Sequence, residues 1–344
     1  MFAAKTLIIV LAILLVVGTG LFITKKVAFS ILNKGRRVSK IKTEKIEVKY
    51  LNDKYLSMEK TLNKKILNDE DFEDWEKKQK EIEKLKGTRQ RVFVLDFTGG
   101  VNALREEITA IIAVVTPKDE VIIRLKSYGG SATRFGLGAA QLHRLKDGLI
   151  PLTVVVDEAA LSGGYAVACV ADNLYCAPFA RVGSIGVVWD TMNYNRILEK
   201  YGIDYELFTA GEYKRLVTTF GEITEEARQK TREKLAEIHD LFKKLVATHR
   251  HLVDIDSVDT GEGWYGTHAL ALNLVDKLIT SDEVLLSRIK VADVYHISYN
   301  EINSGPMKSL EDRIISAILR LIRRILNMFQ MNFAEEENNH FGKP

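Results

Sequence analysis

The sequence contains little cysteine and little proline. Two cysteines in 344 residues, Cys169 and Cys176, exclude a disulfide framework and a cysteine-based zinc site. Five prolines, 46% hydrophobic residues and 28% charged residues exclude a collagenous, disordered or disulfide-rich chain. The length allows one large domain with accessory segments, or two domains.

Most of the chain also lacks an excess of basic residues, although the net charge is +3. Residues 24–45 hold eight basic residues and one acidic residue, and Lys5 adds one positive charge, so residues 46–344 carry a net charge of −5. A body without basic surface has little means of releasing counterions from phosphates. We therefore expect no nucleic-acid partner.

One long uncharged run stands near the N-terminus. Residues 6–24 contain no charged side chain, and as a helix they would reach about 28 Å, close to the hydrocarbon thickness of a bilayer. The run predicts a transmembrane anchor over residues 1–25. A cleaved signal peptide is the alternative, because Lys5 and the following apolar stretch resemble its first two regions, but no convincing cleavage site follows.

The residues after this run are rich in charge. The basic residues directly behind the anchor favour a cytosolic flank by the positive-inside rule, and they also suit anionic membrane lipid. The sequence thus predicts a single-pass protein of the inner (plasma) membrane. Residues 26–88 as a whole predict a basic and then charged helical linker, since Lys and Glu pair at helical spacing.

The middle of the chain predicts an α/β domain over residues 89–300. Its short apolar runs predict buried strands at residues 92–95, 121–125, 152–156, 174–177, 185–189 and 205–208. The first three begin about 30 residues apart with helical stretches at 103–115 and 133–146 between them, which is the spacing of βαβ units. Helices are also predicted over residues 224–246 and 267–274.

The C-terminal region covers residues 305–344. Gly305-Pro306 breaks the chain, and apolar residues at helical spacing from Leu310 to Phe329 predict an amphipathic helix flanked by arginines, with an acidic tail behind it. Three placements fit this helix: a membrane interface, a neighbouring subunit, or its own domain.

Two glycine pairs follow predicted strands. Gly129-Gly130 follows the second strand and Gly163-Gly164 follows the third. Ligands of open α/β sheets bind beyond the carboxyl ends of strands, where glycine lets a backbone N–H approach without a Cβ in the way. Tight strand-to-helix turns would need the same glycines. Neither pair belongs to a phosphate-binding motif, so a nucleotide is not the expected ligand.

Ser162 stands before the second glycine pair, at a predicted helix start. Partial positive charge there favours an oxyanion, although the position also suits a helix N-cap. A serine nucleophile needs a base, usually histidine. No histidine lies between His143 and His239, and His239, His249 and His251 are expected to face solvent on or just after the long helix.

Lysine is the other base found in such sites, provided that burial or a nearby cation makes it neutral near pH 7. Lys214 is the candidate, because it follows the predicted strand at 205–208 and the turn residue Gly211, with Arg215 beside it. Most lysines, however, lie at the surface without such a role. From the residues alone, both assignments stay open.

Five blocks carry a resemblance to a known family. They are VIIRLKSYGGSA, AALSGGYAVACVAD, RVGSIGVV, TAGEYKRLVTTFGEITEEAR and GEGWYGTHALALNLVDKLI, in this order. Over about residues 90–290 the chain resembles the signal peptide peptidase A family of membrane-bound serine proteases, most closely its SohB-like branch. Tyr128 stands where the family usually has proline, which could alter how the oxyanion strand is held. Asn273 replaces the usual glycine at a helix end, where asparagine is the next best residue.

The resemblance implies a fold, an assembly and a mechanism. The fold is the crotonase-like, ClpP-like spiral of ββα units, and the assembly is a homo-oligomeric ring with active sites facing inward. Ser162 is the implied nucleophile, Lys214 the general base and Ser184 the hydroxyl that orients the lysine. The N–H groups of Gly129 and Gly163 would form the oxyanion hole. No cofactor and no metal is implied.

Peptides are the expected substrates. Tyr128, Gly130, Leu161 and Val187 are expected to border the cleft, and they offer no charged anchor for a substrate side chain. This composition predicts a preference for apolar, extended segments such as signal peptides or membrane-protein fragments.

Two other functions compete with a protease. A crotonase-type acyl-CoA hydratase or isomerase would also use paired N–H groups, but it would leave Ser162 and Lys214 without roles. A catalytically silent membrane scaffold would not need the intact set of two serines and a lysine. The side of the membrane stays open as well, because the family is expected outside the cytoplasm and the flanking charges point inside.

Overall fold

The structure is a computed structural model that describes residues 45–211 and 213–300. These residues belong to one compact unit. The predicted anchor at residues 1–25, the basic flank before residue 45 and the C-terminal region at 305–344 lie outside the described residues. Within the described part of the chain, no helix combines the length and the apolar character that crossing a bilayer requires.

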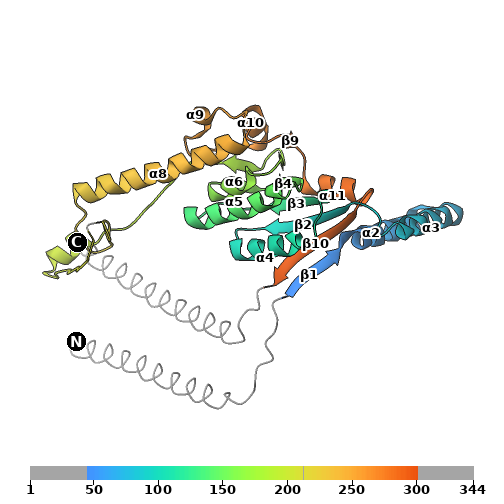
Figure 1. Cartoon of the computed structure of the whole chain (residues 1–344), viewed down its shortest axis with the longest axis horizontal. Coiled ribbons are helices and arrows are strands. Elements are labelled where there is room, and N and C mark those ends of the chain that lie inside the picture. The colour runs from blue at the N-terminus through green and yellow to red at the C-terminus, as the bar shows by residue number, and fades with distance from the viewer. Residues whose placement is uncertain (1–44, 212, 301–344) are drawn as a thin grey trace, which may run out of the picture. The chain divides into compact units, whose positions relative to one another are not determined.

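A seven-stranded sheet forms the centre of this unit (Figure 1). All neighbouring strands run parallel except β1, which is antiparallel to β10. The central strands are rich in valine and isoleucine and buried on both faces, as expected for a parallel sheet covered on both sides. In spatial order the strands are β1 (Lys45–Tyr50), β10 (Asp293–Asn300), β2 (Arg91–Phe97), β3 (Glu120–Leu125), β4 (Leu152–Val156), β6 (Asn173–Cys176) and β9 (Lys277–Leu278).

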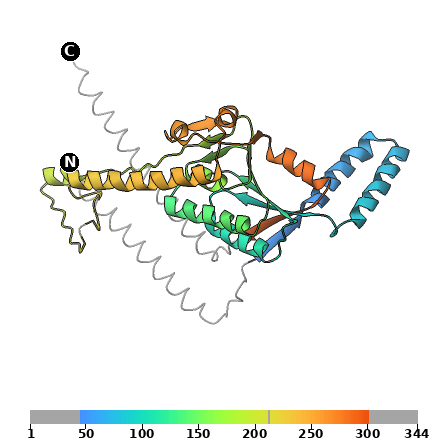
Figure 2. The ribbon, with the colours of Figure 1, turned by 45° about the horizontal axis from the view of Figure 1, so that its top comes forward.

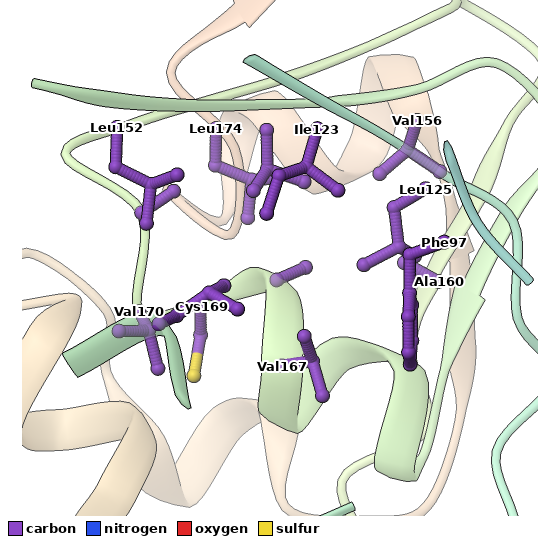
Figure 3. Close-up of a cluster of buried hydrophobic side chains, with 14 of the residues drawn as sticks. Phe97, Ile123, Leu125, Leu152, Val156, Ala160, Val167, Cys169, Val170 and Leu174 are labelled. Atoms are coloured by element: carbon purple, nitrogen blue, oxygen red, sulfur yellow. The ribbon is translucent and has the colours of Figure 1, made fainter. Parts of the chain in front are cut away.

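Helices cover both faces of the sheet. The larger hydrophobic core lies between the sheet and α4 (Val101–Ile112), α5 (Ala132–Asp147) and α6 (Gly163–Ala168). Figure 3 shows part of it, where Ile123, Leu125 and Leu174 of the sheet face Val167, Cys169 and Val170. A smaller core on the other face packs α11 (Ser281–Ile289) against β2, β3 and β10. Together the two cores hold the strand ends, and the loops that follow them, in fixed positions.

Most predicted elements are confirmed. The apolar runs at 92–95, 121–125, 152–156 and 174–177 form β2, β3, β4 and β6. The predicted helices correspond to α4, α5, α8 (Glu225–His249) and α10 (Gly266–Ala271). Thr224 caps α8 by accepting a hydrogen bond from the Ala227 N–H, which explains where that helix begins.

Two predicted strands, at residues 185–189 and 205–208, are wrong. Between β7 (Arg181–Gly183) and α8, the described residues form one short helix, α7 (Asn195–Lys200), and otherwise no regular structure. A strand needs a neighbour that accepts and donates its backbone hydrogen bonds. Here none is offered, and apolar side chains such as Val188 and Phe208 are 86% and 88% exposed. We call residues 187–223 the exposed segment.

A second, three-stranded sheet was not foreseen. It has the order β5-β7-β8, with β5 (Ala159–Leu161) parallel to β7 and β8 (Gly263–Tyr265) antiparallel to it. The short helix α9 (Ile255–Val258) precedes β8. These strands have three residues each, too few for a period-two pattern to stand out in the sequence.

The charged stretch before residue 89 is more than a linker. Its described part contains two helices, α2 (Leu51–Ile66) and α3 (Asp69–Lys84), where a helical linker was expected, and neither has a buried residue. It also contributes β1 to the sheet, so the folded domain begins at residue 45 rather than at the predicted 89. Tyr50 fixes the junction by donating a hydrogen bond to Asp293, 2.9 Å away. In Figures 1 and 2 both helices project from the body.

Candidate active site

Ser162 lies in a sharp turn between β5 and α6, beyond the carboxyl end of β4. Its backbone angles are φ 51° and ψ −122°, a conformation that side-chain-bearing residues rarely adopt. The Ser162 N–H donates to the Gly183 carbonyl at 2.8 Å, and the Ser162 carbonyl accepts from the Tyr165 N–H at 2.9 Å. Its hydroxyl does not cap α6. The turn is therefore fixed by backbone bonds while the hydroxyl is left for another task.

The Gly129 loop is pressed against this turn. Gly129 has a φ of +94°, and a Cβ there would lie 2.8 Å from the Ser162 Cβ and 3.1 Å from the Gly163 nitrogen. A contact under 3.0 Å leaves no room for a side chain, so glycine is required by both conformation and space. The structure thus brings together Gly129, Ser162 and Gly163, the three residues that the family resemblance placed in the nucleophile and oxyanion site.

Two residues that sequence reasoning missed hold this arrangement. Ser127 is buried; its N–H donates to the Ala159 carbonyl and its carbonyl accepts from the Leu161 N–H, which joins the Gly129 loop to β5. Phe135 packs against both the Gly129 loop and the Ser162 turn, because a Cβ at Gly130 would lie 2.9 Å from its ring and a Cβ at Gly163 would clash with the same ring. The only signal in the sequence was that both residues lie within a few positions of a glycine pair.

Two backbone N–H groups, those of Gly129 and Gly163, lie close to Ser162. Gly163 is the first residue of α6, so its N–H has no acceptor within the helix. The Gly129 N–H donates to the Ser127 hydroxyl at 3.2 Å, a long bond that a stronger acceptor can replace. Backbone N–H groups at a helix start stabilise negative charge on oxygen. Chemically, the arrangement suits a nucleophile beside an oxyanion hole.

Ser184 is held near the Ser162 turn through its neighbour Gly183. It follows Gly183, whose carbonyl accepts from Ser162, and its own N–H donates to the Glu262 carbonyl at 2.6 Å. Like Ser162, it has a left-handed φ, here 54°. Its side chain is half-buried. A second hydroxyl-bearing residue is therefore held in a strained conformation beside the first.

Lys214 is not brought to the serines within one chain. It belongs to the exposed segment, its side chain is exposed, and its N–H donates to the Gly211 carbonyl at 3.2 Å. Among the described residues, no hydrogen bond or ion pair joins Lys214 to Ser162 or Ser184. In Figures 1 and 2 the chain that precedes α8 lies at the end of that helix far from α10. One chain thus provides the nucleophile side of the site without its predicted base.

The residues expected to border the cleft have mixed positions. Tyr128 is 69% exposed and Gly130 is also exposed, whereas Leu161 and Val187 are half-buried. A Cβ at Gly263 would lie 2.8 Å from a methyl group of Leu161, so that side chain packs against β8. Tyr128 and Gly130 lie on the Gly129 loop, Leu161 ends β5 directly before Ser162, and Val187 lies on the chain that leaves Ser184.

Two histidines do not face solvent as expected. His239 on α8 is half-buried, with its Nε2 3.3 Å from the Ile185 carbonyl oxygen. His249 is half-buried against His143, with 2.9 Å between their Nε2 atoms. His251 is exposed, as predicted. Across residues 45–300, apart from position 212, no three metal-ligating side chains gather into a group able to hold an ion.

Comparisons with known proteins agree with this geometry. The model "Peptidase family S49 N-terminal" matches residues 1–142, and "Peptidase family S49" matches residues 144–294. "Probable protease SohB" of Haemophilus influenzae is 42% identical over 285 residues, which cover 77% of this chain and 81% of that protein. "Probable protease SohB" of Buchnera aphidicola is 41% identical over 287 residues, or 78% and 82% of the two chains.

A more distant relative points the same way. A protein of Enterococcus faecium whose name refers to signal peptide peptidase SppA is 27% identical over 191 residues, which cover 54% of this chain and 55% of that protein. The two family models together span most of the chain. The chain therefore belongs to peptidase family S49, a family of serine proteases, as the five sequence blocks had indicated.

Proposed function

We propose that this chain is a membrane-anchored serine endopeptidase with Ser162 as its nucleophile. The observation that carries this proposal is the contact of the Gly129 loop with the strained Ser162 turn, which leaves the Gly163 N–H open. The Ser162 hydroxyl oxygen attacks the peptide carbonyl carbon. The resulting oxyanion accepts hydrogen bonds from the Gly163 and Gly129 N–H groups. The C–N bond then breaks, the amine leaves with the proton that the serine gave up, and water hydrolyses the acyl ester that remains on Ser162.

Lys214 is the proposed base, and a neighbouring copy of the chain supplies it. A lysine base has to be neutral, and burial favours the neutral form. Within one chain the Lys214 side chain is exposed and unconnected to Ser162. Packing of the exposed segment against a second copy would bury Lys214 and many apolar side chains at once. Ser184 would then orient the lysine, and the assembly would be a homo-oligomeric ring.

The proposed substrates are apolar, extended peptides, such as signal peptides or membrane-protein fragments. The four residues proposed to border the cleft, Tyr128, Gly130, Leu161 and Val187, carry no charged side chain. Residues 1–25 are the proposed single-pass anchor in the inner (plasma) membrane. The parallel sheet, with a small second sheet beyond its strand ends, fits a crotonase-like spiral of ββα units.

The test uses a fluorophosphonate probe on the full chain in detergent or vesicles. Labelling of the wild type and loss of labelling in Ser162→Ala are expected. A chain that never labels would overturn the assignment and favour a scaffold or an acyl-CoA enzyme. Co-expression of Ser162→Ala with Lys214→Ala tests the shared site, because mixed assemblies regain sites with both intact residues. If confirmed mixed assemblies do not regain fluorophosphonate labelling, Lys214 of a neighbouring copy is not the base.

A further inference from the structure

The chain enters and leaves the described unit at the same end of the sheet as Ser162. β1 and β10 are antiparallel, with Lys45 opposite Asn300. β10 is parallel to β2, with His296 beside Val94, so Asn300 is level with the residues just after the carboxyl end of β2. The carboxyl ends of β2, β3 and β4 meet at this end of the sheet, and the Ser162 turn follows them.

The distances involved are short compared with a membrane. Three strand spacings separate β1 from β3, the strand that leads into the Gly129 loop. At about 4.8 Å per spacing, this is about 15 Å across the sheet. The Gly129 loop in turn touches the Ser162 turn. Measured across the sheet, the strand that leads to the site is therefore about 15 Å from β1, less than half the thickness of a bilayer of about 40–45 Å.

The sequences on either side of the unit are of the kind that binds lipid. Nineteen uncharged residues and then a basic stretch precede β1, and an apolar face flanked by arginines follows β10. Opposite residues of an antiparallel pair are about 5 Å apart. The proposed anchor before β1 would hold that end of the sheet near the membrane, and the C-terminal helix would add to this if it lies at the membrane interface, one of its three placements.

The Ser162 end of the sheet exposes aromatic rings, whereas the exposed apolar side chains of the opposite end, such as Leu149 and Val114, are aliphatic. At the Ser162 end, Tyr128 and Phe179 follow β3 and β6 and are 69% and 87% exposed, and exposed aromatic rings suit a membrane interface. At the opposite end β1 leads into α2 and α3, whose sequence is rich in Lys and Glu and which bury no residue. The α2–α3 hairpin is therefore suited to a fully solvent-exposed position.

From these observations, and resting on the membrane anchoring proposed above, we propose that the Ser162 end of the sheet faces the membrane surface. The site then receives peptide segments as they emerge from the bilayer rather than from bulk solvent. The α2–α3 hairpin points away from the membrane.

Engineered cysteines provide the test, because the natural pair, Cys169 and Cys176, is buried. Phe179→Cys lies after β6 at the Ser162 end, and Leu149→Cys lies before β4 at the other end; the replaced side chains are 87% and 78% exposed. Each full-length variant is labelled with a donor fluorophore and placed in phosphatidylglycerol vesicles whose headgroups carry an acceptor. Thr98→Cys and Val114→Cys form a second pair with the same placement, should one of the first fail to fold.

Greater energy transfer from positions 179 and 98 than from 149 and 114 is the expected result. Equal or reversed transfer overturns the orientation. Fluorophosphonate labelling of the same vesicles reads the catalytic assignment separately, so a labelled enzyme with reversed transfer remains a serine protease. Failure to sediment with the vesicles overturns anchoring and orientation together.

Discussion

The Ser162 turn and the exposed segment are opposite in construction, although both carry residues of the proposed dyad. The turn rests on a buried core and is fixed by backbone hydrogen bonds, with glycines where no Cβ fits. The exposed segment has no strand partner and leaves large apolar side chains uncovered. One chain therefore builds a rigid turn for the proposed nucleophile and oxyanion hole, while the placement of the proposed base depends on what covers the exposed segment.

Ser162→Ala is expected to have the largest effect, and it should affect catalysis without affecting folding. Ser162→Ala should lower peptide hydrolysis by about 10⁴-fold or more, since loss of a serine nucleophile removes the covalent route. The melting temperature should change little, because the hydroxyl caps no helix. Hydrolysis assays and thermal melts on the same preparation check both parts. Hydrolysis at a rate close to that of the wild type would remove Ser162 from the mechanism.

Lys214→Arg tests the other region. Arginine keeps the positive charge but does not release its proton near neutral pH, so this variant should lose about 10²–10⁴-fold in rate, as Lys214→Ala should. Folding should be unchanged, because the side chain is exposed in the single chain. Lys200→Ala, a change on the same segment, serves as the control and should keep full activity. An active arginine variant would contradict a base role.

Gly129→Ala probes the contact between loop and turn. The new Cβ would stand 2.8 Å from the Ser162 Cβ at a φ of +94°, so we expect about 10²-fold lower activity and a loss of about 1–3 kcal/mol in unfolding free energy. Gly136→Ala is the matched control: its Cβ would meet nothing within 4 Å, and alanine should stabilise α5 by about 0.5–1 kcal/mol. Equal behaviour of the two variants would refute the close approach.

Phe208→Ser tests whether a second copy of the chain packs against the exposed segment. This side chain is 88% exposed in the single chain, so a polar replacement should weaken self-association without lowering the stability of the fold. Sedimentation velocity of the full chain in detergent measures the assembly. Leu252→Ser, at a site 81% exposed just beyond α8, should leave it unchanged. If both variants assemble like the wild type, Phe208 does not lie in the subunit contact.

The smallest effect concerns the joint between α8 and the body. Burial, and then the neighbouring His143, lower the pKa of His249 to about 4, assisted by Lys146 and His251 and opposed by Asp172. The folded state therefore disfavours the proton, and its stability should fall as the pH drops from about 6.5 toward 4. His249→Gln should flatten this part of the stability profile in urea titrations, whereas His251→Gln should not. Parallel profiles for all three proteins would contradict this.

The sequence predicted the sheet better than the exposed segment for a physical reason. Runs such as 121–125 and 152–156 became strands because neighbours on both sides complete their hydrogen bonds. Residues 205–208 show the same apolar character but have no such neighbour, which a local pattern does not reveal. β1 was missed because its side chains are mostly exposed and its sequence is rich in charge.

The candidate site divides in the same way. Gly129, Ser162 and Gly163 could be brought together from the sequence because each follows one of two adjacent parallel strands, and motif order supplied their roles. The position of Lys214 depends on some 30 residues without regular pairing, so no periodicity fixed it. Ser127 and Phe135 act through backbone contacts and packing, and such roles leave no sequence motif from which they could be predicted.

The pairing of Lys45 with Asn300 also decides how the domain would respond to tension. A pull on both flanks would open the β1–β10 ladder from one end, breaking its hydrogen bonds one after another rather than all at once. Such peeling needs little force, because each bond contributes only about 1 kcal/mol net. β1 would detach first and absorb the extension, while the parallel strands that support Ser162 stay paired. Unpairing of β1 at the sheet edge would thus protect the strands that position Ser162 from the applied force.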